Sequence, residues 1–559
     1  MSERVKKYNT KALTVAFLLS LMLPVVILAY TEQNPLWTTV SGILLPLGLY
    51  TLFVSLSSRA GRMVWWGFIF VFFSAFQIVL SYLFGNSVVA ADMFLNLLTT
   101  NPGEATELLG NIYPSVIAVC VIYLPLLWRG WVQLRHRAVI PKRWRRRMLI
   151  FGGATFVVGC LSLFLGCRGE VRKTLRDDVF PVNVCYNMCL SISEARKIAH
   201  FELSSEGFSY EAVRRGQVEG REIYVLIIGE AARASSWQLY GYERPTNPRL
   251  VERDDIVLFE GITTQSNTTH KSVPMILSSV HTSEHEALFC RKGLPAMFNE
   301  AGFTTYFISN QKPQGAMIDK LAADADHLLY MDAPYYDMQL VEAMREAIAT
   351  DPSPRLLFIL HAYGSHFSYH QRYPRQYATF LPDDDVAISR KNVGKIRNAY
   401  DNSIRYTDLF IDEVISLLEA QSDACSAMLY CADHGEDLFD DSNGRFLHAS
   451  PTVTYYQLHV ASLAWFSARY KSLYADKAAA ALENRKAPAT TYSVFHTMGD
   501  MASVESPYLR DEASLVSREF DYAAPRLYLN DHNEAVALDR EIGIDRGQKE
   551  LFHRAGIEL

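Results

Sequence analysis

Five long apolar stretches with almost no charge lie in the first third of the chain, and they limit its possible folds more than any other feature. Each approaches the ~20 residues that an α-helix needs to cross a hydrocarbon core of ~30 Å. A cleaved signal peptide would explain the first stretch but none of the other four. The stretches cover roughly residues 12–30, 37–57, 64–84, 115–128 with an extension to about 134, and 148–167. The sequence therefore predicts a transmembrane domain of five helices over residues 1–167.

The basic residues of this region alternate between the two ends of the predicted spans. They precede the first span, recur between the second and third, and cluster between the fourth and fifth, whereas none lies between Met63 and Trp128. By the positive-inside rule, the N-terminus is cytoplasmic and everything after Cys167 is outside. The run RWRRR at 143–147 is then a cytoplasmic membrane anchor rather than a nucleic-acid site.

The charge of the chain is divided unevenly. Residues 1–170 carry 15 Lys and Arg against six Asp and Glu, so the remainder must carry −15 for the chain to reach its net charge of −6. A mildly acidic outer domain has no basic field for a polyanion, and we expect no nucleic-acid partner. Its five cysteines are odd in number and unevenly spaced, which leaves no legible disulfide framework; a Cys185–Cys189 pair is one open possibility.

The outer part of the chain has the pattern of an α/β domain. Residues 168–220 are mixed and polar and are expected to form a helical linker. Apolar runs of strand length then alternate with helical stretches, of which 400–420 is the clearest. Such strands indicate a mainly parallel sheet covered on both faces, here over residues 221–559. The strand-length runs are 223–229, 303–309, 355–363, 426–432 and 459–467.

Three of these strands are followed by side chains that bind metals or transfer protons. In an open parallel sheet, ligands bind beyond the carboxyl ends of the strands. A single residue of this kind after a strand is usually a loop residue or a helix cap. When three strands are each followed by such residues, a shared site is favoured. Carboxylate and imidazole donors suit Zn²⁺ in tetrahedral geometry. The residues are Glu230 after the first strand, His361 and His366 at the third, and Asp433, His434 and Glu436 after the fourth.

The stretch TTQSNTTHKSVPMILSS, residues 263–279, places four threonines before an apolar run. A hydroxyl bound to Zn²⁺ has a lowered pKa and acts as an alkoxide at neutral pH. Ser272 is a candidate N-cap and Pro274 suits a first helical turn, whose positive end favours negative charge. The pattern does not choose among the threonines, and a turn that only caps the helix fits it equally well.

Taken together, these segments resemble the membrane-bound phosphoethanolamine transferases of the Gram-negative envelope, whose catalytic domain belongs to the alkaline phosphatase/sulfatase superfamily. The likeness covers nearly the whole chain and is carried by GEAARASSWQLYGYERPTNP (229–248), TTHKSVP, HAYGSHFSYHQRYP and ADHGE. The resemblance implies zinc ligands and a threonine nucleophile, Thr269. The implied ligands are Glu230, Thr269, Asp433 and His434, and the implied contacts to the phosphoryl group or a second zinc are His361, His366 and, in RFLHASP, His448.

The resemblance also implies a binding segment for the ethanolamine-phosphate head of the donor lipid. NLLTTNPGEA in the outer loop matches it and gives Asn96, Thr100 and Glu104. The same letters can be read as a helix N-cap, Asn101, with its capping-box partner.

The implied reaction is a two-step transfer. Thr269 attacks the phosphorus of phosphatidylethanolamine and releases diacylglycerol, after which a lipopolysaccharide (lipid A or core) or another envelope glycan takes the phosphoethanolamine. The protein is expected in the bacterial inner membrane, with its catalytic domain in the periplasm. The alternatives are a glycerol-phosphate polymerase of the lipoteichoic-acid type and a non-catalytic, glycan-binding membrane protein. A sulfatase reaction is disfavoured because 272–276 lacks the arginine of the Cys/Ser-x-Pro-x-Arg signature.

Two departures from the family pattern bear on the acceptor. Met275 stands where lipid A-modifying members have a cysteine, and the spacing from Asp433 to His448 is about two residues longer. They leave the metal and nucleophile assignments in place and suggest another subgroup.

Overall fold

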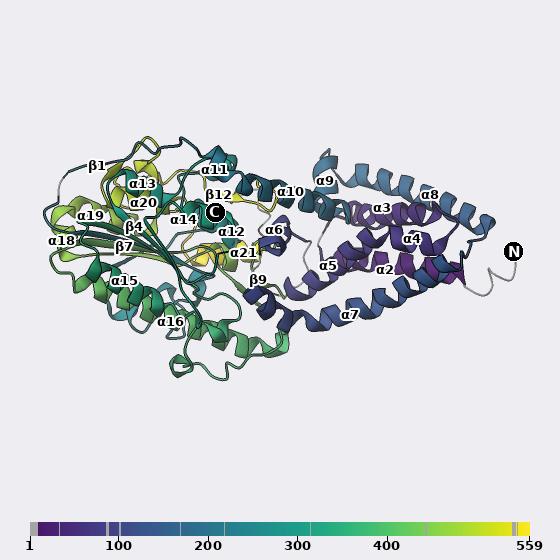
Figure 1. Cartoon of the computed structure of the whole chain (residues 1–559), viewed down its shortest axis with the longest axis horizontal. Helices are drawn as coiled ribbons and strands as arrows, with labels where there is room; N and C mark the ends of the chain where they lie inside the picture. Colours follow the sequence, from purple (N-terminus) through teal and green to yellow (C-terminus); the bar gives the residue numbers. More distant parts are fainter. Residues whose placement is uncertain are drawn as a thin grey trace. The chain divides into compact units, whose positions relative to one another are not determined.

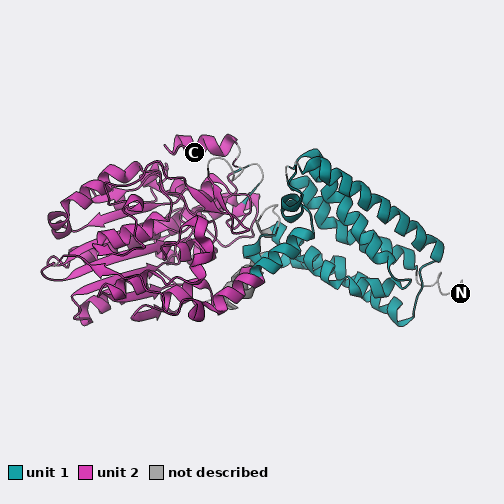
Figure 2. Ribbon diagram, turned by 90° about the horizontal axis from the view of Figure 1, so that it is seen from above, with its two compact units in different colours: residues 1–94, 103–191, 441–445 teal, residues 95–102, 192–440, 446–559 magenta. Residues whose placement is uncertain are grey.

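The computed structural model describes residues 9–559 apart from 33, 85–88, 100–101, 168, 217, 314, 442–443, 539–543 and 545. The chain forms two compact units, which are coloured separately in Figure 2. Unit 1 comprises residues 1–94, 103–191 and 441–445; unit 2 comprises 95–102, 192–440 and 446–559. The boundary after residue 191 falls inside the stretch expected as a linker, 168–220, and that assignment stays a prediction.

Unit 1 contains the predicted apolar stretches as helices. Among the described residues, four helices are long and apolar enough to cross a membrane, and a bent pair forms a fifth. The two helices of the pair meet at 56° around Gly67. The helices are α2 (Thr10–Thr31), α3 (Leu36–Ser55), the pair α4 (Ala60–Trp66) and α5 (Phe68–Phe84), α7 (Pro102–Arg135) and α8 (Lys142–Gly166); α6 (Ala91–Thr99) precedes α7.

Small residues let α3 and α8 approach closely. A Cβ atom on Gly48 would lie 2.7 Å from the backbone nitrogen of Phe156, and one on Gly159 would lie 2.9 Å from that of Leu45. Helices in lipid associate through such close backbone packing, because lipid tails supply no hydrophobic drive between them. The outward side chains in the later part of α8 are apolar, as at Leu161, which is 59% exposed.

Unit 2 is built on a seven-stranded mixed sheet in the order β3-β10-β7-β2-β6-β4-β5. The five strands from β7 to β5 are parallel, whereas β10 runs antiparallel to both β7 and β3. The predicted α/β class with a mainly parallel sheet is therefore confirmed. The strands are β2 (Glu222–Gly229), β3 (Ile256–Leu258), β4 (Thr304–Ser309), β5 (His327–Tyr330), β6 (Arg355–His361), β7 (Cys425–Ala432) and β10 (Ser462–Phe466).

Helices cover both faces of this sheet, so its central strands are buried along their whole length. In Figure 1, α13 (Leu294–Glu300) and α20 (Ser493–Met501) lie on one face, and α15 (Met338–Thr350) and α16 (Val393–Glu419) lie on the other. This arrangement explains the unbroken apolar runs of β2 and β7. The expected helix over 400–420 is the later part of α16, and its predicted apolar side is buried.

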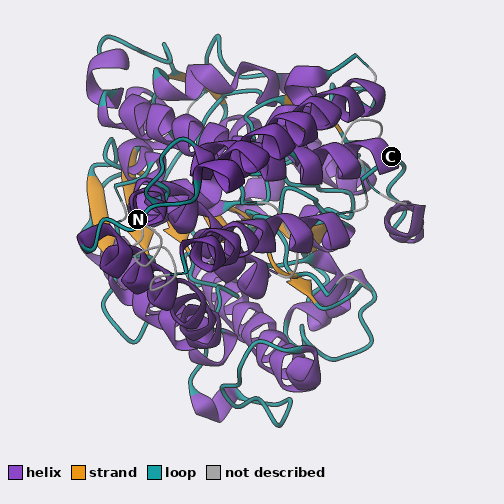
Figure 3. Cartoon of the chain, turned by 90° about the vertical axis from the view of Figure 1, so that its right-hand side faces the viewer, coloured by secondary structure: helices purple, strands orange, loops and turns teal. Residues whose placement is uncertain are grey.

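Figure 3 shows the helices in purple and the strands in orange. Outside the main sheet, two of the small sheets in the described part of unit 2 are pairs of two-residue strands. They are β1 (Val213–Arg214) with β11 (Val504–Glu505), and β8 (Asp437–Leu438) with β9 (Phe446–Leu447); β12 (Leu527–Leu529) pairs with β13 (Ala535–Ala537). The other helices are α9 (Val171–Asp178), α10 (Val182–Ala199), α11 (Phe201–Ser204), α12 (Thr269–Ile276), α14 (Met317–Ala322), α17 (Tyr455–Leu458), α18 (Ala468–Leu473), α19 (Ala475–Glu483) and α21 (Arg546–Arg554).

The cysteine thiols are free in the structure, including those of Cys185 and Cys189.

Candidate active site

The carboxyl ends of neighbouring strands bring the predicted ligands together. Gly229 at the end of β2 pairs with Ala432 at the end of β7, so the next residues, Glu230 and Asp433, leave the sheet side by side. The backbone N–H of Asp433 donates to the carbonyl of Gly229 at 2.9 Å. β6 ends in the same row, where Ile228 pairs with His361.

The predicted nucleophile is the first residue of a helix that points its hydroxyl at these ligands. α12 begins at Thr269, and Thr268 is its N-cap residue. The expected N-cap at Ser272 is wrong, because the N–H of Ser272 already donates to the carbonyl of Thr268 at 2.8 Å and closes the first turn. Thr263 and Thr264 donate instead to the backbone carbonyls of Ala489 and Asp433.

Four donor groups converge at this helix start. The Thr269 Oγ1 lies 3.3 Å from each carboxylate oxygen of Glu230 and 3.0 Å from His434 Nε2. That nitrogen is also 3.5 Å from Glu230 Oε1 and 3.3 Å from Asp433 Oδ2. The His434 Nδ1 lies 2.9 Å from the carbonyl of Gly435, which can only accept, so the proton is on Nδ1 and Nε2 carries a lone pair.

Burial dominates the electrostatics of the cluster. Glu230 is 1% exposed, and Asp433 and His434 are fully buried. Burial, with the neighbouring Asp433 adding to it, raises the pKa of Glu230 well above its usual range, and burial lowers the pKa of His434. Two adjacent carboxylates removed from water are costly unless a cation balances them.

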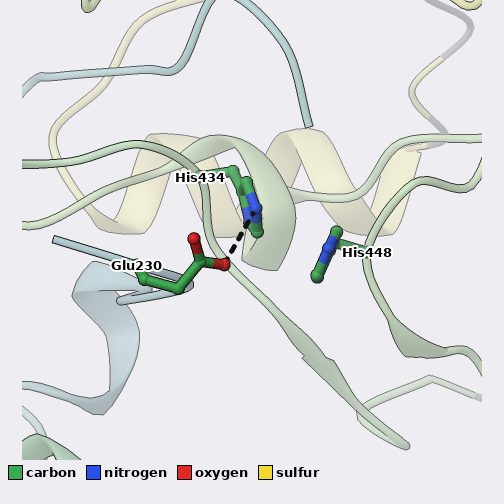
Figure 4. Close-up of side chains that lie close together, drawn as sticks. All are labelled: Glu230, His434 and His448. Carbon is green, nitrogen blue, oxygen red and sulfur yellow. Dashed lines mark ion pairs between the residues drawn. The ribbon is translucent and has the colours of Figure 1, made fainter. Parts of the chain in front are cut away.

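These residues fit a zinc ion, because zinc binds carboxylate oxygen and imidazole nitrogen, and oxygens of Glu230 and Asp433 lie 3.5 and 3.3 Å from His434 Nε2. The clustered donors Glu230, His434 and His448 each offer a ligand atom, and all three atoms lie within 4.8 Å of one another. Figure 4 shows these three side chains converging, with the ion pair between Glu230 and His434 as a dashed line. This group contains two of the four predicted ligands, Glu230 and His434, together with His448, which the family resemblance implied as a contact to the phosphoryl group or a second zinc.

A second layer of contacts orients the carboxylates. Gln311 is nearly buried, and its Nε2 donates to Glu230 Oε2 at 3.1 Å and to the carbonyl of Ala362 at 2.9 Å. Asp433 Oδ1 accepts from the N–H groups of Ala231 and His434, at 3.1 and 2.7 Å. Sequence reasoning missed Gln311, although it is the second residue after β4, and its position close behind an apolar strand was the available signal.

The three predicted histidines have different surroundings. His361 has its Nδ1 3.0 Å from Ser309 Oγ on β4. The His366 Nδ1 lies 2.6 Å from the carbonyl of Phe367, which leaves Nε2 with a lone pair. Burial lowers the pKa of His361 to about 4 and that of His366 to about 3.

His448 lies against the predicted ligand His434. Its ring centroid is 4.0 Å from that of His434, and its Nδ1 is 2.8 Å from Glu436 Oε2. Burial lowers the pKa of His448 to about 4 and raises that of Glu436 to about 8. The nearby charges of His448 and His434 also help to lower the pKa of His366, so all three rings share one region.

The predicted head-group residues cannot be placed against this site. Thr100 lies outside the described residues, as do the side chains of Asn96 in α6 and Glu104 in α7. Their role stays a prediction.

Known proteins resemble this chain in sequence and in fold. The family model described as Sulfatase matches residues 222–504. The Kdo(2)-lipid A phosphoethanolamine 7''-transferase of Salmonella typhimurium is 26% identical over 480 residues, covering 79% of this chain and 83% of that protein. The integral membrane lipooligosaccharide phosphoethanolamine transferase A of Neisseria meningitidis shares the fold, with a TM-score of 0.70 and 21% identity over 91% of this chain and 96% of that one.

The C-terminal periplasmic domain of EptC from Escherichia coli, solved in complex with Zn, also shares the fold of unit 2. Its TM-score is 0.53 at 22% identity, over 59% of this chain and 96% of that one.

Proposed function

This chain belongs to the sulfatase family, whose model matches just over half of it, and from that premise we propose that it is a zinc-dependent phosphoethanolamine transferase. The donor is phosphatidylethanolamine, and the acceptor is a lipopolysaccharide (lipid A or core) or another envelope glycan. One observation carries the proposal: the Thr269 Oγ1 lies 3.0 Å from His434 Nε2 and 3.3 Å from both oxygens of Glu230. A relative that is named as acting on Kdo(2)-lipid A supports the substrate class.

Glu230, Thr269, Asp433 and His434 would hold the zinc ion, with His448 close by. When bound, zinc supplies positive charge that lowers the pKa of the threonine hydroxyl and offsets the charge on the phosphoryl oxygens.

The chain's own groups then perform two displacements. In the first, Thr269 Oγ1 loses its proton and forms a bond to the phosphorus of the donor, the bond from phosphorus to the diacylglycerol oxygen breaks, and that oxygen takes up a proton. In the second, an oxygen of the acceptor loses its proton and attacks the same phosphorus, the bond to Thr269 breaks, and Oγ1 regains a proton. His366 is neutral at physiological pH, and its Nε2 lone pair can accept the acceptor's proton.

A lipid donor explains why the catalytic unit is joined to apolar helices that are long enough to cross a membrane. We place the protein in the bacterial inner membrane, with its N-terminus in the cytoplasm and unit 2 in the periplasm, because the basic residues follow the positive-inside pattern.

Diacylglycerol release tests the proposal. The purified full chain in detergent is incubated with head-group-labelled phosphatidylethanolamine, beside Thr269→Ala and the control Thr268→Ala. We expect release by the wild type and by Thr268→Ala but none above background by Thr269→Ala. Equal release by wild type and Thr269→Ala would refute the nucleophile. Release from phosphatidylglycerol in place of phosphatidylethanolamine would favour glycerol-phosphate transfer instead.

A further inference from the structure

A buried carboxylate outside the predicted ligand set connects His448 to a tyrosine. Glu436 is fully buried. Its Oε1 accepts a hydrogen bond from the hydroxyl of Tyr369 at 2.6 Å, and its Oε2 lies 2.8 Å from His448 Nδ1. The row Tyr369–Glu436–His448 therefore ends at the ring that lies 4.0 Å from His434.

The fold brings Glu436 and His448 together through a short strand pair. β8 and β9 are antiparallel, with Asp437 opposite Leu447 and Leu438 opposite Phe446. Glu436 precedes β8 by one residue and His448 follows β9 by one, so the two occupy the next opposed position of the ladder, where side chains are neighbours. The long spacing between Asp433 and His448 in the sequence is used to form this pair of strands.

The backbone on both sides of the pair is fixed. The N–H of Glu436 donates to the carbonyl of Tyr456 at 2.9 Å, and the buried guanidinium of Arg233 donates to the carbonyl of Glu436 at 3.2 Å. His448 stands between Leu447 and Ala449, whose φ angles are 64° and 63°. Left-handed backbone at residues with a Cβ is unfavourable, and it persists where surrounding contacts require it, often at functional sites.

The pairing decides which nitrogen of His448 is available. Nδ1 is committed to Glu436, and the shared hydrogen lies between the two atoms whichever of them carries it. Nε2 is the nitrogen left for the cluster around Thr269, and the ring cannot turn without breaking the bond to Glu436. We propose that Glu436, supported by Tyr369, is a positioning residue that holds the His448 imidazole in register for phosphoethanolamine transfer. The proposal rests on the function proposed above.

A double-mutant cycle tests this role. Diacylglycerol release is measured for wild type, Glu436→Gln, His448→Ala and the double variant, with rates normalised to bound metal. We expect Glu436→Gln to lower kcat by about 10–100-fold, the usual effect of residues that orient active-site histidines, with little change in KM. Because Glu436 acts through His448, the same change in the His448→Ala background should cost less than about twofold. Tyr369→Phe should show the same pattern with a smaller loss.

Asp437→Asn is the matched control. Asp437 is the adjacent buried carboxylate, and it accepts from Thr454 Oγ1 at 2.7 Å and Gln457 Nε2 at 2.5 Å. The loss of activity caused by Asp437→Asn should be the same in the wild-type and His448→Ala backgrounds. If Glu436→Gln also loses the same factor in both backgrounds, Glu436 has only a structural role and the inference is overturned.

A spectroscopic measurement separates this inference from the proposed function. Imidazole ¹⁵N spectra of histidine-labelled protein are recorded, with the His448 signals identified by their loss in His448→Ala. Glu436→Gln should shift the Nδ1 signal of His448, and unchanged signals would contradict the inference. If the wild type releases no diacylglycerol, the proposed function fails, and the spectra alone decide whether Glu436 orients His448.

Discussion

In unit 1 glycines of α8 let the backbone of α3 approach closely, whereas at the end of the sheet in unit 2 buried charged side chains lie next to one another. Gly159 would place a Cβ 2.9 Å from the backbone of Leu45, while Glu230 and Asp433 share a volume from which water is excluded. The first arrangement depends on shape. The second depends on charge balance, so it implies a cation and concentrates chemistry at one end of the sheet.

Removing one ligand charge should have the largest effect. Asp433→Asn keeps the side-chain shape but weakens metal binding, and we expect transfer to fall by more than about 100-fold, beyond the range for residues that only orient ligands. Chelation of the wild type should have the same result, and zinc should restore the wild type but not the variant. The metal-free variant should unfold no earlier than the metal-free wild type, since it buries one carboxylate fewer. Activity close to that of the wild type would show that Asp433 is not a ligand.

Loss of the second-layer amide should have an intermediate effect. Gln311→Leu removes the donor to Glu230 Oε2, and metal affinity should weaken by about 10–100-fold, measured by competition with a chelator. The neighbouring Lys312→Gln serves as the control, because its amine pairs with the exposed Asp332 at 2.8 Å, and the metal affinity of this variant should not change. Equal affinities for wild type and Gln311→Leu would remove Gln311 from the site.

In unit 1, adding a single methyl group should distinguish two glycines of one helix. Gly159→Ala should destabilise the protein by about 1–3 kcal/mol through overpacking against α3. Gly153→Ala has nothing within 4 Å of its new Cβ and should be neutral or stabilising by up to about 1 kcal/mol, the helix propensity gained. Thermal unfolding in detergent measures both. The same shift for the two variants would contradict the packing described here.

Acidification should lower the free energy of unfolding of unit 2 in small steps. Burial lowers the pKa of His459 from 6.5 to about 4, and its ring nitrogens lie 3.0 Å from the Tyr455 hydroxyl and 2.9 Å from the Glu260 carbonyl. Between these pH values the unfolded chain binds a proton that the folded chain does not, so this residue costs up to about 1.4 kcal/mol per pH unit as the pH falls from 6.5 towards 4. Unfolding midpoints at pH 7 and 5 measure the slope, and His459→Gln should reduce it. An unchanged slope would exclude this residue as a source.

The same comparison explains what could be predicted from the sequence. Apolar length is a local property, so the membrane helices and the central strands of the sheet were found, and the strand ends pointed to Glu230, Asp433 and His434. The sequence pattern left four threonines open, and the family resemblance was needed to choose Thr269. Contacts between segments that are far apart in the sequence leave no periodic pattern in either segment. Glu436 opposite His448 depends on two-residue strands, and Gln311 reaches Glu230 from the segment after β4, so neither partnership was predicted.

The N-terminal boundary of α12 was misplaced for a related reason. Ser272 and Pro274 have the composition of a helix start, but the first turn forms one residue after Thr268, and this brings the Thr269 hydroxyl to the ligands. The start of α12 is therefore set by the tertiary contacts of the site and not by local capping preferences.

The covalent state of Thr269 is the most direct test of the central claim. The purified chain is incubated with phosphatidylethanolamine without any acceptor, quenched in acid, digested and mapped by mass spectrometry. The account predicts phosphoethanolamine on the peptide that contains Thr269, with fragmentation that assigns it to this residue rather than Thr268, and loss of the adduct when acceptor is added. Turnover of the lipid with no adduct on Thr269, or with the adduct on another residue, would contradict it.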